Sequence, residues 1–143
     1  MATAHVDGLN LEVATPLGLA LKASVENVQA PSVSGEFGVL PGHLPLLASL
    51  KSGILKYKSG GKDHVAAIGP GFVEAGPEKV IVLTDKFVTA ADVDVEAARK
   101  ELATAEEKLR ALVGENITAE QQELQRDAEW AQAQLDLASL GAN

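Results

Sequence analysis

Apolar and polar residues alternate through most of residues 1–90. Leu9, Leu11 and Val13 are separated by Asn10 and Glu12, and this period of two predicts a β-strand with one face turned toward a core. Turn-forming residues interrupt the pattern at intervals of roughly ten residues. Many short strands with frequent turns favour a β-sandwich or flattened barrel over a parallel sheet.

Two of the turns predict β-hairpins. Residues 54–58 and 64–68 flank a glycine pair, Gly60 and Gly61, which suits the tight turn of a hairpin. A second hairpin is predicted where residues 76–79 separate two further apolar runs.

After Asp92 the period changes to that of an α-helix. Apolar residues recur at spacings of three and four, which places them in one seam along each of two helices. The first seam comprises Val95, Ala98, Leu102, Ala105, Leu109 and Leu112, and the second comprises Leu124, Ala128, Ala131, Leu135 and Ala138. Gly114 is expected to end the first helix, and Thr118 to cap the second with Gln121 three residues later. We therefore predict a β-domain over residues 1–90 and an antiparallel helical hairpin over residues 91–143.

Trp130 and Leu137 form a further stripe, one position ahead of the seam residues Ala131 and Ala138. Such a stripe predicts a contact between the hairpin and the β-domain or a partner. The alternative is a single broadened hydrophobic face within the hairpin.

Composition narrows the classes of function. The net charge is −8, and residues 91–143 carry 12 acidic and 5 basic residues against 8 and 7 in residues 1–90. This charge repels phosphate backbones, and a 3% aromatic content leaves few rings for base stacking, so we expect no nucleic-acid partner. No signal or transit peptide is visible, and no apolar run approaches roughly 20 residues, so direct membrane insertion is not expected.

A search for catalytic chemistry finds no motif. The chain has no cysteine, and its histidines, His5, His43 and His64, lack the spacing of zinc ligands. No phosphate-binding loop and no nucleophile elbow occur. We therefore expect no catalytic residues, no metal site and no cofactor. A small enzyme that uses His43 as a lone general base is the alternative.

The most unusual segment is residues 35–47, which read GEFGVLPGHLPLL. Its glycines and prolines fix the backbone, while its apolar side chains are too numerous for an ordinary solvated loop. Pro41 and Gly42 suit the middle of a type II turn. The segment is therefore either a stiff docking loop or a loop that covers the core and needs turn residues.

This segment, followed by Leu50, Gly53 and Ile54, closely resembles the signature of the epsilon subunits of F-type ATP synthases, which correspond to the mitochondrial delta subunits. The resemblance extends over nearly the whole chain, from the N-terminal strand to the helical hairpin.

The resemblance implies a sandwich of about ten strands and a non-catalytic subunit of the central stalk. The sandwich would bind the gamma subunit and the ring of c subunits, coupling proton-driven rotation of the ring to ATP synthesis in the catalytic head. Glu36, Phe37, Gly38 and His43 would lie at the surface facing the ring or gamma. Four further residues would shape that surface: Leu40, Pro41, Gly42 and Pro45.

The chain departs from the family in its hairpin. Some relatives bind ATP through an Asp-x-x-Arg-Ala motif; Asp94 matches the aspartate, but Ala97 occupies the arginine position, and Arg99 lies about 200° away around the helix. We therefore expect no nucleotide site and predict that Arg99 bridges to a neighbouring acid. The second helix holds one base, Arg126, among five acids, so contact with acidic segments of the alpha/beta head would be repulsive. Weak or absent inhibition of ATP hydrolysis follows.

The resemblance places the protein peripherally on the cytoplasmic face of a bacterial inner membrane, although an organellar chain already trimmed would look similar. A free-standing β-sandwich module that dimerises through its hairpin remains a further alternative to the rotor subunit.

Overall fold

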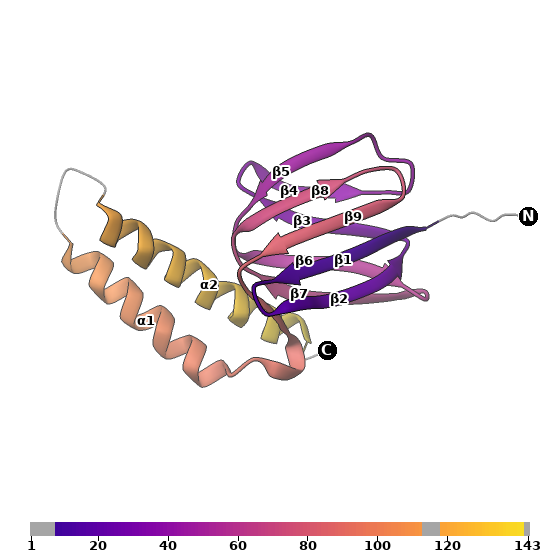
Figure 1. Cartoon of the computed structure of the whole chain (residues 1–143). Coiled ribbons are helices and arrows are strands. Elements are labelled where there is room, and N and C mark those ends of the chain that lie inside the picture. The colour runs from indigo at the N-terminus through magenta and orange to yellow at the C-terminus, as the bar shows by residue number, and fades with distance from the viewer. Residues whose placement is uncertain (1–7, 113–117, 142–143) are drawn as a thin grey trace, which may run out of the picture.

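The computed structural model describes residues 8–112 and 118–141, which form a β-sandwich followed by two helices (Figure 1). The strands are β1 (Leu9–Thr15), β2 (Gly18–Val25), β3 (Asn27–Ser32), β4 (Gly35–Val39), β5 (Leu46–Leu50), β6 (Gly53–Ser59), β7 (Lys62–Ile68), β8 (Gly71–Ala75), β9 (Lys79–Thr84) and β10 (Phe87–Thr89). A short 3₁₀ helix, η1 (Ala90–Asp92), leads to α1 (Val95–Ala111) and α2 (Ala119–Gly141). The predicted class, a ten-stranded β-sandwich with a helical hairpin, is confirmed.

The strands follow the order β10-β7-β6-β3-β5-β8-β9-β1-β2, with β4 added to β3. β3 meets β5 through the single pair Ser32 and Leu50, so the sheet bends there into two layers. The inner faces of the layers enclose a core of Leu9, Leu11, Val13, Val25, Val28, Ala30, Val39, Leu50, Leu55, Ile68, Val73, Ala75, Val80 and Val82. The alternating apolar and polar residues that predicted β1 therefore point alternately into the core and toward the surface.

Both predicted hairpins are present. Gly60 and Gly61 join β6 to β7 with φ angles of 60° and 76°, the left-handed conformation that two-residue hairpin turns require at both positions. β8 and β9 pair antiparallel around the second turn. One pairing lies outside the prediction, because β1 runs parallel to β9.

The two helices pack against each other, and the residues of the predicted seams differ in burial. Ala98, Ala105 and Ala131 are almost fully buried, whereas Leu102 and Leu109 are half-buried. Small buried side chains permit close approach of two helices, and the contact of α1 with α2 through these seams stays a prediction. The other leucines and the valine of the seams, Val95, Leu112 and Leu135, are also half-buried, and Leu124 is buried.

The helix ends match the prediction in part. The Thr118 hydroxyl accepts the Gln121 backbone N–H at 3.1 Å, so Thr118 caps α2 as predicted. Leu112 is the C-terminal cap of α1 rather than a residue of its interior. The predicted stop at Gly114 falls outside the described residues.

Candidate docking surface

The segment that carries the sequence signature is two strands and a short connection, so the prediction of one continuous loop was wrong. Gly35–Val39 forms β4, Leu46–Leu50 forms β5, and only residues 40–45 connect them. Phe37 and Val39 turn inward and contact the core. The glycines of this segment weakened the alternation that would have marked β4 as a strand.

The connection itself is held in one conformation by its turn residues. Gly42 has a φ of 84°, and the His43 N–H donates to the Leu40 carbonyl oxygen at 3.1 Å, which fits the predicted type II turn at Pro41 and Gly42. The Gly42 N–H also donates to the Pro77 carbonyl oxygen at 2.8 Å. The connection is thereby fastened to the turn between β8 and β9, at the end of the sandwich away from the helices (Figure 1).

Apolar side chains on this connection face solvent. Leu40 is 63% exposed and Leu44 is 79% exposed. Pro45 is exposed as well, while Pro41 and His43 are half-buried. His43 Nδ1 lies 2.5 Å from the Leu44 carbonyl oxygen, so this ring nitrogen is the donor of that hydrogen bond. A rigid backbone that presents exposed leucines suits a protein contact.

The remaining predicted contact residues divide between the two sides of β4. Glu36 and Gly38 are exposed on its outer side. Phe37 is half-buried against the core cluster, so it supports the strand from within.

A second apolar surface, which the sequence analysis missed, lies on the outer face of β5, β8 and β9. Leu47 is 71% exposed, Phe72 56% and Leu83 53%. Phe72 pairs with Leu83 across β8 and β9, and Ile81 continues the same face beside Glu74. The signal was present in residues 80–83, a run of four apolar residues, because a strand with one solvated face would have alternated.

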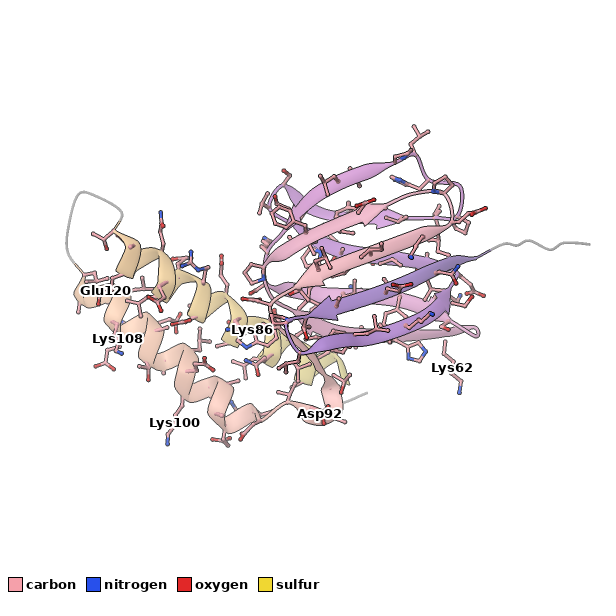
Figure 2. All side chains as sticks on the ribbon, viewed as in Figure 1. Lys62, Lys86, Asp92, Lys100, Lys108 and Glu120 are labelled. Atoms are coloured by element: carbon pink, nitrogen blue, oxygen red, sulfur yellow. The ribbon has the colours of Figure 1, made fainter. Side chains whose placement is uncertain are left out.

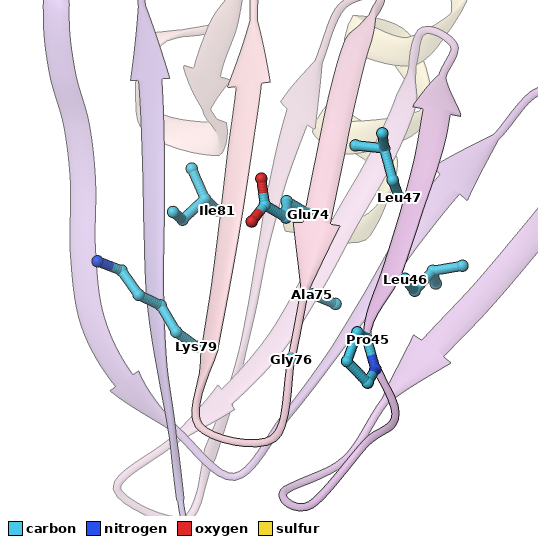
Figure 3. Close-up of a pocket in the computed structure, with 8 residues that line it drawn as sticks. All are labelled: Pro45, Leu46, Leu47, Glu74, Ala75, Gly76, Lys79 and Ile81. Carbon is cyan, nitrogen blue, oxygen red and sulfur yellow. The ribbon is translucent and has the colours of Figure 1, made fainter.

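This outer face is hollowed next to the residue 40–45 connection (Figure 3). The hollow has a volume of about 570 Å³ and is lined by Pro45, Leu46, Leu47, Glu74, Lys79 and Ile81, among others. Lys79 Nζ lies 3.4 Å from a carboxylate oxygen of Glu12 on β1. This ion pair holds the Lys79 ammonium group at the rim of the hollow. The connection and the outer face therefore adjoin at this hollow, and together they form the candidate docking surface.

Over residues 8–112 and 118–141, no three His, Asp or Glu side chains lie close enough to hold a metal ion. Burial raises the pKa of Tyr57 above its usual 10.0, and Tyr57 packs against the core and stacks on His64 with ring centroids 5.1 Å apart. This shift is a property of core packing.

Comparison with known proteins identifies the family. Residues 8–90 match the model of the ATP synthase delta/epsilon chain β-sandwich domain. The chain belongs to this family. Among its relatives, the ATP synthase epsilon chain of Nitratidesulfovibrio vulgaris (strain DP4) is 45% identical over 101 residues, which cover 71% of this chain and 75% of that one. The ATP synthase epsilon chain of Anaeromyxobacter dehalogenans (strain 2CP-1) is 38% identical over 122 residues, 84% of this chain and 92% of that one.

Solved structures share the family fold. A chain of the Euglena gracilis mitochondrial ATP synthase, from an OSCP/F1/c-ring structure, superposes with a TM-score of 0.78 at 22% identity, covering 99% of this chain and 85% of that one. A chain of the Tetrahymena thermophila mitochondrial ATP synthase central stalk and c-ring gives 0.60 at 11% identity, covering 99% of this chain and all of that one. At these identities the likeness shows the fold.

In this family member, the acid of the nucleotide motif serves the helix itself. Asp94 is the N-terminal cap of α1, and its carboxylate accepts the Ala97 N–H at 3.0 Å. Arg99 pairs with Glu96 at 3.0 Å on the exposed side of the helix, which confirms the predicted bridge to a neighbouring acid. Lys100 and Lys108 extend from α1 toward solvent (Figure 2).

Neither described helix is long and apolar enough to cross a membrane.

Proposed function

We propose that this chain is a non-catalytic rotor subunit of the central stalk of an F-type ATP synthase. It couples rotation of the c-ring to ATP synthesis in the catalytic head by binding the ring and the gamma subunit at once. The observation that carries the proposal is the braced connection of residues 40–45, where the Gly42 to Pro77 hydrogen bond fixes exposed Leu40 and Leu44. A contact that transmits torque has to be rigid and apolar, and this one is both.

The two parts of the docking surface suit two partners. The exposed end of the sandwich, with Leu40, His43 and Leu44, contacts the c-ring. The broader outer face, with Leu47 and Phe72, contacts gamma, because an apolar sheet face offers the area that a stable protein interface needs. The complex lies on the cytoplasmic face of a bacterial inner membrane, in keeping with the bacterial relatives.

The hairpin contributes little to regulation. Arg126 is the one base among five acids on α2, so its approach to acidic segments of the head is repulsive. Ala97 offers no charge to a nucleotide, and the Asp94 carboxylate is already engaged as a helix cap. We propose weak or absent inhibition of ATP hydrolysis and no nucleotide site.

The test is a binding measurement between the full chain and purified gamma. Phe72→Asp places a charge on the outer face without touching the core, and we expect gamma affinity to fall by roughly 30-fold, which corresponds to about 2 kcal/mol for a central interface residue. Leu17→Asp is the matched control, since Leu17 is fully exposed on the turn between β1 and β2. It should leave the affinity unchanged.

Two outcomes would contradict the assignment. One is a wild-type chain that neither binds gamma nor co-purifies with the c-ring. The other is an equal loss of gamma affinity in both variants, because that would show a general effect of charge rather than a contact at Phe72.

A further inference from the structure

The two layers of the sandwich differ in what covers their outer faces. On the outer side of β6 and β7, Ile54 and Val65 pack against Trp130 and Leu137 of α2, so the stripe noted in the sequence contacts the β-domain. The outer face of β5, β8 and β9 instead leaves its large apolar side chains exposed to solvent. A partner that covers this second face has to match the polar groups that the face holds.

Glu74 lies in the middle of this exposed apolar face. It is directly opposite Leu47 on β5 and Ile81 on β9, and its side chain is exposed. Figure 3 shows the Glu74 carboxylate between these two side chains. Phe72 precedes Glu74 by two residues on the same side of β8, because side chains of a strand alternate between its faces. The carboxylate therefore has apolar neighbours on both adjacent strands and along its own.

This carboxylate is not paired with a cation of the chain. Glu74 takes part in no ion pair within residues 8–112 and 118–141. Lys79 lines the same hollow, but it extends away from Glu74 toward β1 (Figure 3). There a Glu12 carboxylate oxygen lies 3.4 Å from its Nζ. In the chain alone, water is thus what solvates the Glu74 carboxylate, and a partner that covers the face removes this water.

Loss of that water has a direct consequence for which partner can bind. Removal of a carboxylate from water is strongly unfavourable unless a cation and its hydrogen bonds replace the water. A purely apolar partner surface would leave Glu74 buried and unpaired, so the face disfavours it. A partner that brings a cation to this position meets no such penalty, and one residue thereby discriminates between partners.

The hollow beside Glu74 indicates what kind of cation fits. It has a volume of about 570 Å³, and Pro45, Leu47 and Ile81 give it apolar walls. Arginine combines a methylene stem that packs along apolar walls with a guanidinium group that donates two parallel hydrogen bonds to a carboxylate. Arginine is also enriched at protein interfaces, whereas lysine is depleted there.

We propose that Glu74 is a specificity-determining residue of the docking surface, and that it selects a partner which inserts an arginine side chain into the hollow. The inference rests on the proposed function, in which this partner is gamma, and it names the chemistry of that contact. The leucines and Phe72 supply apolar area, which tolerates sliding. The pair of Glu74 with an arginine fixes the position of the partner on the sheet.

The direction of the change in affinity tests the proposal. Glu74→Gln removes the charge and keeps the shape, and binding of the full chain to purified gamma is measured with its rate constants. We expect the affinity to fall at least about tenfold, mainly through faster dissociation, because the arginine of gamma is then buried without its partner. An unchanged or higher affinity would overturn the proposal, since a carboxylate that is buried without a cation is better removed.

Glu26→Gln is the matched control. Glu26 is exposed between β2 and β3, so its replacement removes the same charge from the sandwich away from the hollow. Its affinity for gamma should equal that of the wild type, and both variants should unfold at the same urea concentration as the wild type. An equal loss of affinity in Glu26→Gln would overturn the proposal, because the effect would then come from net charge alone.

Double-mutant cycles identify the arginine. Each arginine of gamma is changed to alanine, and its effect is measured against the wild-type chain and against Glu74→Gln. We expect one gamma arginine whose replacement weakens binding to the wild type but adds little to the loss in Glu74→Gln. Additive losses for every arginine of gamma would overturn the proposal.

Failure of this inference is distinct from failure of the proposed function. If Phe72→Asp weakens gamma binding and Glu74→Gln does not, gamma uses the outer face without an arginine at Glu74, and only the inference is refuted. If the wild-type chain does not bind gamma, the proposed function is refuted and the inference falls with it.

Discussion

Gly42 meets two requirements that together single out glycine. Its φ of 84° is a conformation that other residues adopt only with strain, and its N–H must point at the Pro77 carbonyl oxygen. Space is not a constraint, because a Cβ on Gly42 would meet nothing within 4 Å. The conformation of the docking connection therefore depends on backbone freedom at one residue.

Gly42→Ala should lower the free energy of unfolding by about 1–2 kcal/mol, the usual cost of a left-handed residue with a side chain. It should also weaken binding to the c-ring, since the connection would have to relax away from Pro77. Gly61→Ala is the control, because Gly61 has a similar φ of 76° and open space for a Cβ but lies on the turn between β6 and β7. Urea unfolding should show a similar loss of stability in both variants, whereas ring binding should fall only in Gly42→Ala; equal losses of ring binding would show that the conformation of the connection is not the cause.

Tyr57 gives a pH-dependent prediction at the same scale. Burial raises its pKa above 10.0 in the folded chain, so at alkaline pH the folded state retains a proton that the unfolded state has lost. Stability should therefore fall as the pH rises above about 10. Tyr57→Phe removes this contribution, and urea unfolding from pH 9 to pH 11 should show a shallower decline in the variant. Identical declines would assign the effect to other groups.

Among the elements, the hairpin depends on small side chains. Ala98 is 1% exposed in the first turn of α1, whereas Ala103 on the same helix is exposed. A much larger side chain at the buried position 98 is therefore expected to disturb the packing of α1.

Ala98→Leu should cost about 1–3 kcal/mol through overpacking. Ala103→Leu should be nearly neutral, because it meets solvent. Thermal unfolding followed by the helical circular dichroism signal measures the difference in stability between the two variants. Equal stabilities would show that the helices separate freely to accommodate the leucine.

Elements with local signals were predictable from the sequence. The Gly60 and Gly61 hairpin and the alanine-centred seams follow from turn chemistry and periodicity, which act over a few residues. The parallel pairing of β1 with β9 did not follow, because its partners are far apart in the chain and nothing local specifies them. β4 was missed since its glycines conceal the alternation. For the candidate site, the sequence located residues 40–45 but not the outer face around Phe72, whose exposure depends on which strands become neighbours.

At the scale of the whole molecule, the proposed function gives the sandwich and the hairpin separate tasks. The candidate docking surface lies at one end and on the outer face of β5, β8 and β9, and the hairpin packs on β6 and β7 of the other layer. A mutation in the hairpin should therefore affect partner binding only indirectly, through the sandwich on which the hairpin packs.

Deletion of residues 91–143 should leave ATP hydrolysis by the reconstituted head nearly unchanged, because the acidic hairpin is repelled from the head. The truncated chain should retain gamma binding but aggregate more readily, since Ile54, Val65 and Ala67 lose their cover. Hydrolysis assays and light scattering measure the two effects. A severalfold rise in hydrolysis would instead show that the hairpin inhibits.

The parallel pairing of β1 with β9 also governs how the chain is made. β1 pairs early with β2, but its other neighbour spans residues 79–84 and leaves the ribosome only after most of the sandwich has been synthesised. Until then β1 is paired on one edge only, although the strands of the opposing layer, β3, β6 and β7, precede β9 in the chain. Closing so long a loop is slow, because its entropy is lost before the contacts form. The nascent chain thus passes through a stage in which one edge of β1 is unpaired, and an unpaired strand edge can pair with another chain.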